Sequence, residues 1–140
     1  GNDYTGPKEY CTGQNSEVYN VNTLKRIMEY LGDARHSEYM TWYMITNKDI
    51  FQVDMAELPK EWIRTYRLTL DVQEDLDMFN ALFEKLDKKE VSIKKVFDVI
   101  DKNPWIHELN DAMVLKYKSD KKLIDMLNKE TRIALPKSKK

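Results

Sequence analysis

The chain has 140 residues, of which 41% are hydrophobic and 34% charged, enough for one domain or part of a larger one. It has no apolar run near the roughly 18 residues of a membrane span and no recognisable leader, so we expect a cytoplasmic protein with no membrane partner. Cys11 is the only cysteine, which excludes an intrachain disulfide and a cysteine-based zinc site.

The formal net charge is −1, but basic residues gather at one end of the chain. Residues 116–140 hold nine Lys or Arg against three Asp or Glu. Such an end could touch phosphates or anionic lipid, yet we expect residues 134–140 to be a disordered basic tail. The chain has no long basic stripe with interleaved aromatics, so we expect no nucleic-acid partner.

The first third of the chain predicts a short strand and two helices. Glycine and proline interrupt residues 1–14, which we expect to be irregular. Residues 17–21 predict a strand. The next helix is expected to begin after Asn22, as its cap, and to end at Gly32. Residues 37–46 predict the second helix.

The middle of the chain predicts two more strands, at residues 50–55 and 66–70. In the second of these, apolar side chains alternate with polar ones, as in a half-buried strand. The period then changes to that of a helix over residues 72–86. Asp71 stands at the junction with Glu74 three residues on, the arrangement of a capping box.

The remainder predicts helices: one capped by Ser92, an interruption at residues 103–104, and a last helix starting near Ser119 or Asp120. Three short strands among helices indicate an α/β fold with a partial sheet. No glycine-rich phosphate loop is present. Ligands of open α/β sheets bind beyond the carboxyl ends of strands, so Asp71 could hold a metal, a ligand hydroxyl or only its own helix.

Three segments, in this order and spacing, resemble one family. They are Gly13-Gln14-Asn15-Ser16-Glu17-Val18-Tyr19, His36-Ser37-Glu38-Tyr39-Met40-Thr41 and Arg67-Leu68-Thr69-Leu70-Asp71-Val72-Gln73-Glu74-Asp75-Leu76. Together with the stretch from Asn110 to Ile124, they resemble the C-terminal half of cytidylyltransferases that act on acidic sugars, in the spore-coat polysaccharide biosynthesis branch. The resemblance covers roughly residues 3–133.

The resemblance implies a Rossmann-like nucleotidyltransferase fold and the conversion of CTP and an acidic sugar to CMP-sugar and pyrophosphate, with Mg²⁺. The family's nucleotide-binding motif and first metal-binding aspartate precede the matched part. We therefore expect a C-terminal fragment, inactive alone and homo-oligomeric. Its expected parts are half of the α/β domain at 1–90, a helical extension at 91–133 and the tail at 134–140.

The resemblance also assigns residues. Asp71 matches the aspartate that completes the Mg²⁺ site, the alternative being a helix cap. Glu17 matches an acidic residue that lines the sugar pocket or supports the metal, the alternative being a surface side chain. The family often has aspartate where this chain has Asn15, which weakens any charge-dependent role there. Arg67 could bind a carboxylate or phosphate through its planar fork, or form a structural salt bridge.

The other titratable residues are expected to be structural. His36 and Glu38 do not share a helix face, and Asp75 lies in the first turn of its helix. His107 has no partner motif, and Cys11 is expected to lie in a loose, flexible segment with no activating neighbour. No residue is assigned as catalytic. A competing hypothesis is a non-catalytic oligomerisation or protein-binding module, with an apolar patch made by Trp105, Phe97 and Met113.

Overall fold

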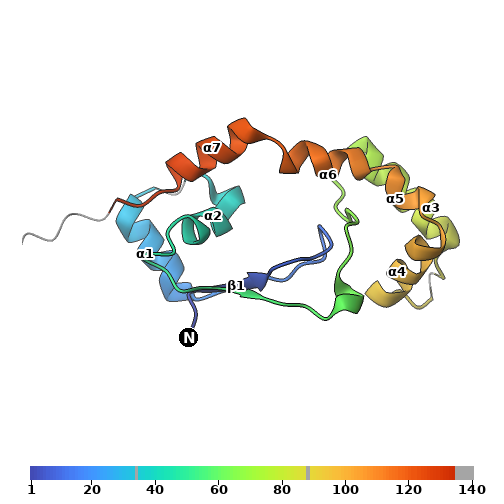
Figure 1. Ribbon diagram of the computed structural model, residues 1–140, viewed down its shortest axis with the longest axis horizontal. Helices are drawn as coiled ribbons and strands as arrows, with labels where there is room; N and C mark the ends of the chain where they lie inside the picture. Colours follow the sequence, from blue (N-terminus) through green and yellow to red (C-terminus); the bar gives the residue numbers. More distant parts are fainter. Residues whose placement is uncertain (34, 88, 135–140) are drawn as a thin grey trace, which may run out of the picture. The chain divides into compact units, whose positions relative to one another are not determined.

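The computed structural model describes residues 1–33, 35–87 and 89–134, with the side chains of 115–118 left aside. The chain divides into two compact units. Unit 1 comprises Gly1–Glu9, Asn15–Leu58 and the chain from Asp120 onward, and unit 2 comprises Tyr10–Gln14 and Pro59–Ser119. Figure 1 colours the elements of both units along the sequence.

The predicted division into an α/β part, a helical extension and a tail, with boundaries at residues 90 and 133, differs from these two units and stays a prediction. Residues 135–140 of the predicted tail lie outside the described range.

Unit 1 contains a three-stranded sheet with the order β2-β1-β3. The central strand β1 (Tyr4–Pro7) runs antiparallel to β2 (Val18–Tyr19) and parallel to β3 (Val53–Ala56). The expected α/β class is therefore confirmed, but the prediction that residues 1–14 are irregular is wrong for β1. Two neighbouring strands complete the backbone hydrogen bonds of this segment. Its glycine and proline are typical of turns and hide the strand in the sequence.

The helices of unit 1 begin and end close to the predicted signals. In α1 (Val21–Leu31), the side chain of Asn20, not Asn22, caps the first turn, and Gly32 ends the helix in the left-handed region at φ 67°. The predicted helix over 37–46 forms as a short 3₁₀ turn, η1 (Ser37–Tyr39), followed by α2 (Met40–Ile45).

The last helix of unit 1, α7 (Lys121–Glu130), begins at the predicted cap, because the Asp120 side chain accepts a hydrogen bond from the Leu123 amide at 2.9 Å. The core of unit 1 is formed by side chains from strand, helix and loop: Tyr4, Ile27, Tyr43, Met44, Phe51 and Ile133.

Unit 2 contains a bundle of short helices packed on one extended segment. After the 3₁₀ turn η2 (Lys60–Trp62), residues 66–70 run into α3 (Gln73–Lys85). There follow α4 (Ile93–Lys102), capped by Ser92 as predicted, then α5 (Trp105–Glu108) and α6 (Asp111–Lys118). The break between α4 and α5 falls at the predicted Asn103-Pro104 step.

The predicted strand at 66–70 is wrong, because the segment is extended but has only one bridge partner, Thr12, in the part the structure describes. The Thr12 amide bonds the Tyr66 carbonyl at 3.0 Å, and the Leu68 amide bonds the Thr12 carbonyl at 2.7 Å. Gly13 makes this approach possible: its φ is 91°, and a Cβ there would lie 2.3 Å from the Leu68 carbonyl oxygen.

The core of unit 2 gathers under α3, α4 and α5 and consists of Cys11, Tyr66, Met78, Leu82, Phe97, Ile100 and Ile106. Two predictions are therefore wrong. Cys11 does not lie in a loose segment but is fully buried, with its thiol donating to the Tyr66 carbonyl at 3.2 Å. Phe97 is 3% exposed and cannot form part of the predicted apolar patch.

No helix among the described residues is long and apolar enough to cross a membrane.

Candidate functional site

Arg67 lies in the extended segment of unit 2, with its guanidinium against the first turn of α3. Its Nε donates to Asp75 Oδ1 and its Nη2 donates to Asp75 Oδ2, both at 2.9 Å. These two parallel bonds from one planar group fix the side chains relative to each other. Arg67 is 5% exposed and Asp75 is 0% exposed, so the predicted alternation, which places Arg67 off the apolar side, is wrong at this residue.

Asp75 is the centre of this network. Besides Arg67, it accepts hydrogen bonds from the Asp71 amide at 3.0 Å, the Thr69 hydroxyl at 3.3 Å and the Asn110 side-chain amide at 2.9 Å. Burial alone would raise the pKa of Asp75, but these bonds and the positive charge of Arg67 together hold it well below its usual range. Asp75 is therefore ionised at neutral pH although its side chain is fully buried.

Asp71 is the exposed member of the network. Its Oδ2 accepts a hydrogen bond from Arg67 Nη2 at 2.9 Å, and its side chain is 63% exposed. The N-cap of α3 is Val72 and has no side-chain cap bond, so the predicted capping box of Asp71 with Glu74 is wrong. Asp71 lies one residue before the N-cap position, and its carboxylate accepts a hydrogen bond from Arg67 instead.

The Asp71 carboxylate fits Mg²⁺ as a single ligand. Its Oδ1 accepts no hydrogen bond from any residue that the structure describes. Mg²⁺ in phosphoryl-transfer sites is usually bound through one or two carboxylates together with substrate phosphates, so one free oxygen is a sufficient contribution. No group of three acidic, His or Cys side chains that could hold a metal occurs among the described residues. Metal binding at Asp71 stays a prediction.

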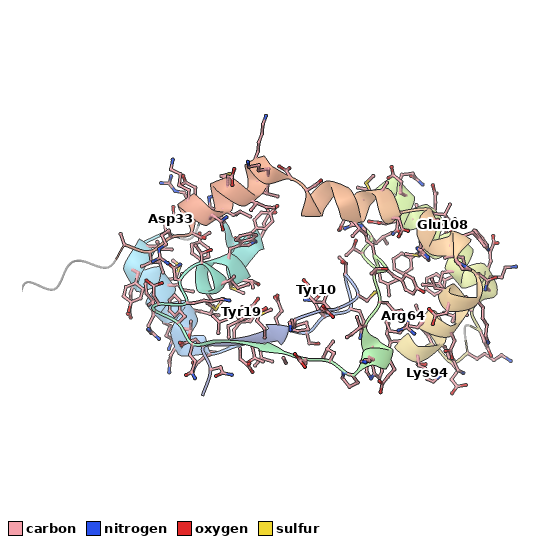
Figure 2. All side chains as sticks on the ribbon, in the orientation of Figure 1. Tyr10, Tyr19, Asp33, Arg64, Lys94 and Glu108 are labelled. Carbon is pink, nitrogen blue, oxygen red and sulfur yellow. The ribbon has the colours of Figure 1, made fainter. Side chains whose placement is uncertain are left out.

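Glu17 lies in unit 1, next to β2, and accepts hydrogen bonds from three hydroxyl groups. Tyr4 donates to its Oε1 at 3.0 Å, Thr41 donates to the same oxygen at 3.1 Å, and Tyr19 donates to its Oε2. The three donors come from β1, α2 and β2. Figure 2 shows Tyr19, whose ring packs at 5.2 Å from that of Tyr4. The sheet and α2 thus hold an exposed carboxylate in one orientation.

The two tyrosines remain protonated donors over a wide pH range. Burial and the hydrogen bond to Glu17 raise the pKa of Tyr19 to about 12, and the same two causes raise the pKa of Tyr4 further. Glu17 belongs to unit 1, whereas Arg67 and Asp71 belong to unit 2.

His107 and His36, which we expect to be structural, have partners close in the sequence. His107 Nδ1 lies 2.9 Å from an Asp111 carboxylate oxygen. The His36 amide donates to the Tyr43 hydroxyl at 3.2 Å. Burial raises the pKa of the Cys11 thiol to about 12, so this cysteine has no activated thiolate at neutral pH.

Three polar partners were not predicted as members of either network. Tyr4 lies in the segment expected to be irregular, and Thr41 is 24 residues from Glu17. Asn110 lies 35 residues from Asp75, and its amide group also donates to the Arg67 carbonyl at 3.0 Å. Local patterns carry no signal for pairs at such separations.

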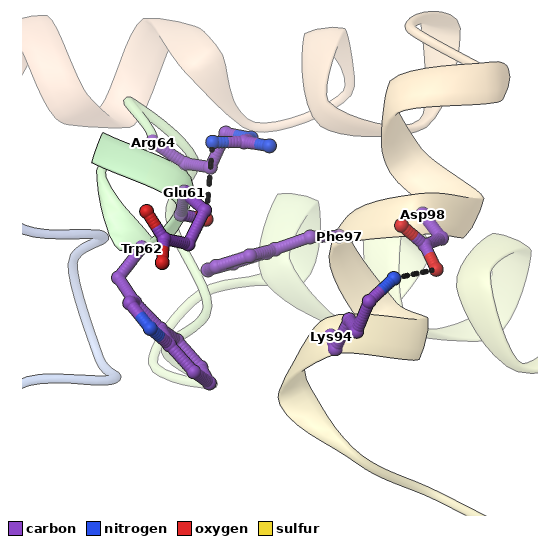
Figure 3. A pocket seen from close by; sticks show the side chains of 6 residues that line it. All are labelled: Glu61, Trp62, Arg64, Lys94, Phe97 and Asp98. Atoms are coloured by element: carbon purple, nitrogen blue, oxygen red, sulfur yellow. Dashed lines mark hydrogen bonds and ion pairs between the residues drawn. The ribbon is translucent and has the colours of Figure 1, made fainter. Parts of the chain in front are cut away.

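Unit 2 also contains a cavity of about 140 Å³ between η2 and α4. Figure 3 shows Phe97 in the middle of its lining, with Trp62 on one side and Lys94 on the other. Lys94 is held by Asp98 at 2.9 Å, and the Arg64 guanidinium lies 5.2 Å from the centre of the Phe97 ring. None of the predicted site residues lines this cavity.

Comparisons with known proteins identify relatives over about three quarters of the chain. No protein-family model matches it. The chain is 31% identical over 107 residues to the spore coat polysaccharide biosynthesis protein SpsF of Bacillus subtilis, covering 74% of this chain and 45% of SpsF. It is 30% identical over 110 residues to the uncharacterised protein MJ1063 of Methanocaldococcus jannaschii, covering 77% of this chain and 45% of the relative.

A solved structure shares the fold. The cytidylyltransferase from Leptospira borgpetersenii matches with a TM-score of 0.62 at 24% identity, over 75% of this chain and 45% of that one. The predicted resemblance is therefore confirmed at the level of homology and fold. The chain spans about half the length of the relatives it matches.

Proposed function

We propose that this chain, a homologue of SpsF with the fold of a cytidylyltransferase, forms part of an enzyme that transfers a cytidylyl group from CTP to an acidic sugar and releases pyrophosphate. The observation that carries the proposal is the fixed, exposed Asp71 carboxylate at the start of α3, within a fold shared with a cytidylyltransferase. The relatives are about twice as long as the matched stretch, so the nucleotide-binding loop is proposed to lie outside these 140 residues.

Asp71 is proposed to supply one oxygen ligand to Mg²⁺. When bound, the ion would neutralise the charge that develops on the phosphates. The contribution of the chain is to hold this carboxylate at a fixed place: Arg67 bonds Oδ2 and leaves Oδ1 for the ligand. Arg67 itself is buried and bonded to Asp75, so its proposed role in substrate binding is indirect, through the orientation of Asp71.

Glu17 is proposed to bind hydroxyl groups of the sugar. Three hydroxyl donors fix its carboxylate, and it remains exposed, so its free acceptor positions can take further hydrogen bonds from a ligand. A fixed acceptor loses little side-chain entropy when it binds, which favours its use in recognition.

The test is pyrophosphate release from CTP with Mg²⁺ and a panel of acidic sugars, assayed on the 140-residue chain alone and on the protein at its full natural length. We expect activity only for the longer protein and a loss of about 100-fold or more in Asp71→Ala, because one ligand to the metal is removed. Asp77→Ala is the matched control: among the described residues, this exposed α3 carboxylate bonds only Gln73. Equal activity of the two variants would contradict the proposal.

A second proposed property is self-association through unit 1. Val18, Val21 and Met28 are 65%, 64% and 49% exposed, which leaves several large apolar side chains of β2 and α1 uncovered. Their burial between two copies would favour a homo-oligomer, and this contact is also what a non-catalytic assembly module would use. Sedimentation velocity across a hundredfold concentration range tests it. A monomer throughout, unchanged in Val21→Asp, would exclude self-association.

A further inference from the structure

We propose that Asp75 is a positioning residue, which fixes the backbone and side chain of Asp71 and neutralises Arg67 so that a divalent cation can bind at the Asp71 carboxylate. This inference rests on the proposed function, because it takes Asp71 as the ligand. Asp75 itself is 0% exposed and cannot touch the cation.

The geometry connects Asp75 to Asp71 by two routes. Asp75 Oδ2 accepts a hydrogen bond from the Asp71 amide at 3.0 Å, which fixes the main chain. The same oxygen accepts from Arg67 Nη2 at 2.9 Å, and this nitrogen also donates to Asp71 Oδ2 at 2.9 Å, which fixes the side chain. A single buried carboxylate therefore determines both where Asp71 lies and where its carboxylate points.

The charges explain why the buried partner must be ionised. A cation at Asp71 would lie close to the guanidinium of Arg67, which repels it. With Asp75 ionised, the three side chains carry one net negative charge. With a neutral residue at position 75, they carry none, and Arg67 no longer has the Asp75 carboxylate to balance its charge. The cation would then compete with the guanidinium for Asp71.

Asn110, in the turn between α5 and α6, also bonds this network. Its side-chain amide donates to Asp75 Oδ1 at 2.9 Å and to the Arg67 carbonyl at 3.0 Å. The bond from Asn110 holds Oδ1 of Asp75, while Oδ2 accepts from the Asp71 amide, so both oxygens of this carboxylate are held.

The experiment measures binding of the Mn²⁺–CTP complex to the full-length protein by water-proton relaxation. The variants are Asp71→Ala, Asp75→Asn and the matched control Asp77→Asn, which removes the same charge from an exposed position on the same helix. We expect Asp75→Asn to bind at least about 10-fold more weakly, Asp77→Asn to bind within about twofold of the wild type, and amide exchange of Asp71 to accelerate only in Asp75→Asn.

The outcomes separate this inference from the proposed function. If Asp71→Ala weakens binding but a folded Asp75→Asn does not, Asp75 has no positioning role and the proposed function stands. If Asp71→Ala binds as the wild type does, the metal role of Asp71 fails and this inference fails with it. Should Asp75→Asn not fold, Thr69→Val removes the 3.3 Å bond to Asp75, the one hydrogen bond that the Thr69 hydroxyl makes among the described residues. A fall of about threefold supports the inference, and unchanged binding overturns it.

Discussion

Replacing Arg67 by Met should destabilise unit 2 strongly at neutral pH. The substitution removes the two 2.9 Å bonds to Asp75 and the 2.9 Å bond to Asp71, and it leaves the Asp75 carboxylate, which is 0% exposed, without the Arg67 charge. Breaking a buried ion pair in this way costs about 3–5 kcal/mol. The Asp71 amide, Thr69 and Asn110 still donate to Asp75, so we expect the low end, about 3 kcal/mol.

Urea denaturation followed by tryptophan fluorescence measures the loss. With a slope near 2 kcal/mol per molar, a loss of about 3 kcal/mol lowers the midpoint by roughly 1.5 M. The double variant Arg67→Met with Asp75→Asn is the internal control. It retains an acceptor for the neutral donors but removes the unpaired charge, so it should be more stable than Arg67→Met alone. A double variant no more stable than the single one would refute the reasoning.

The pH dependence gives a second check. In the wild type the folded pKa of Asp75 lies below its unfolded value of 3.8, so its contribution to stability is complete above about pH 4 and is lost as the pH falls through the folded pKa. In Arg67→Met, burial without a cation raises that pKa, and protonation relieves the unpaired charge. The stability difference between wild type and variant should therefore shrink from pH 7 to pH 3. A constant difference would contradict this.

Three further predictions follow from particular contacts. Gly13→Ala should lower the free energy of unfolding by at least about 2 kcal/mol, because it adds a backbone clash to a positive φ. Gly32→Ala, with open space around it, should lower it by only about 1 kcal/mol. Equal losses of the two variants in thermal denaturation would exclude the clash. Cys11 should react with iodoacetamide at pH 8 only after urea is added, since burial raises its pKa to about 12; rapid labelling of the native protein would contradict its burial. Glu17→Gln should lower the pKa of Tyr19 from about 12, measured by ultraviolet titration. Because a raised pKa in the folded state gives folding stability that is lost as the pH rises from 10 to 12, the variant should lose less stability over that range. An unchanged titration would show that Glu17 does not accept the Tyr19 hydrogen bond.

The helices of this protein are predictable from the sequence because their start and stop signals are local. Ser92 and Asp120 cap α4 and α7 through bonds that span three residues, and Gly32 ends α1 through its own backbone conformation. Such interactions need no other part of the fold. The resemblance of the 67–76 segment likewise pointed to the relatives and the fold that the comparisons then confirmed.

The sheet and the buried network depended on partners far away in the chain. Tyr4–Pro7 is a strand only because Val53–Ala56 and Val18–Tyr19 pair with it. Arg67 has the position of an exposed side chain in the alternating pattern, yet it is buried.

By itself, therefore, the sequence determined the helices, the α/β class and the candidate residues Glu17, Arg67 and Asp71. Only the tertiary structure shows that buried Asp75 bonds the Arg67 guanidinium and the Asp71 amide, and that Asn110 bonds Asp75. The physical reason is that a buried charge is stable only where its partners converge, and a local pattern cannot contain partners that lie 35 and 43 residues apart.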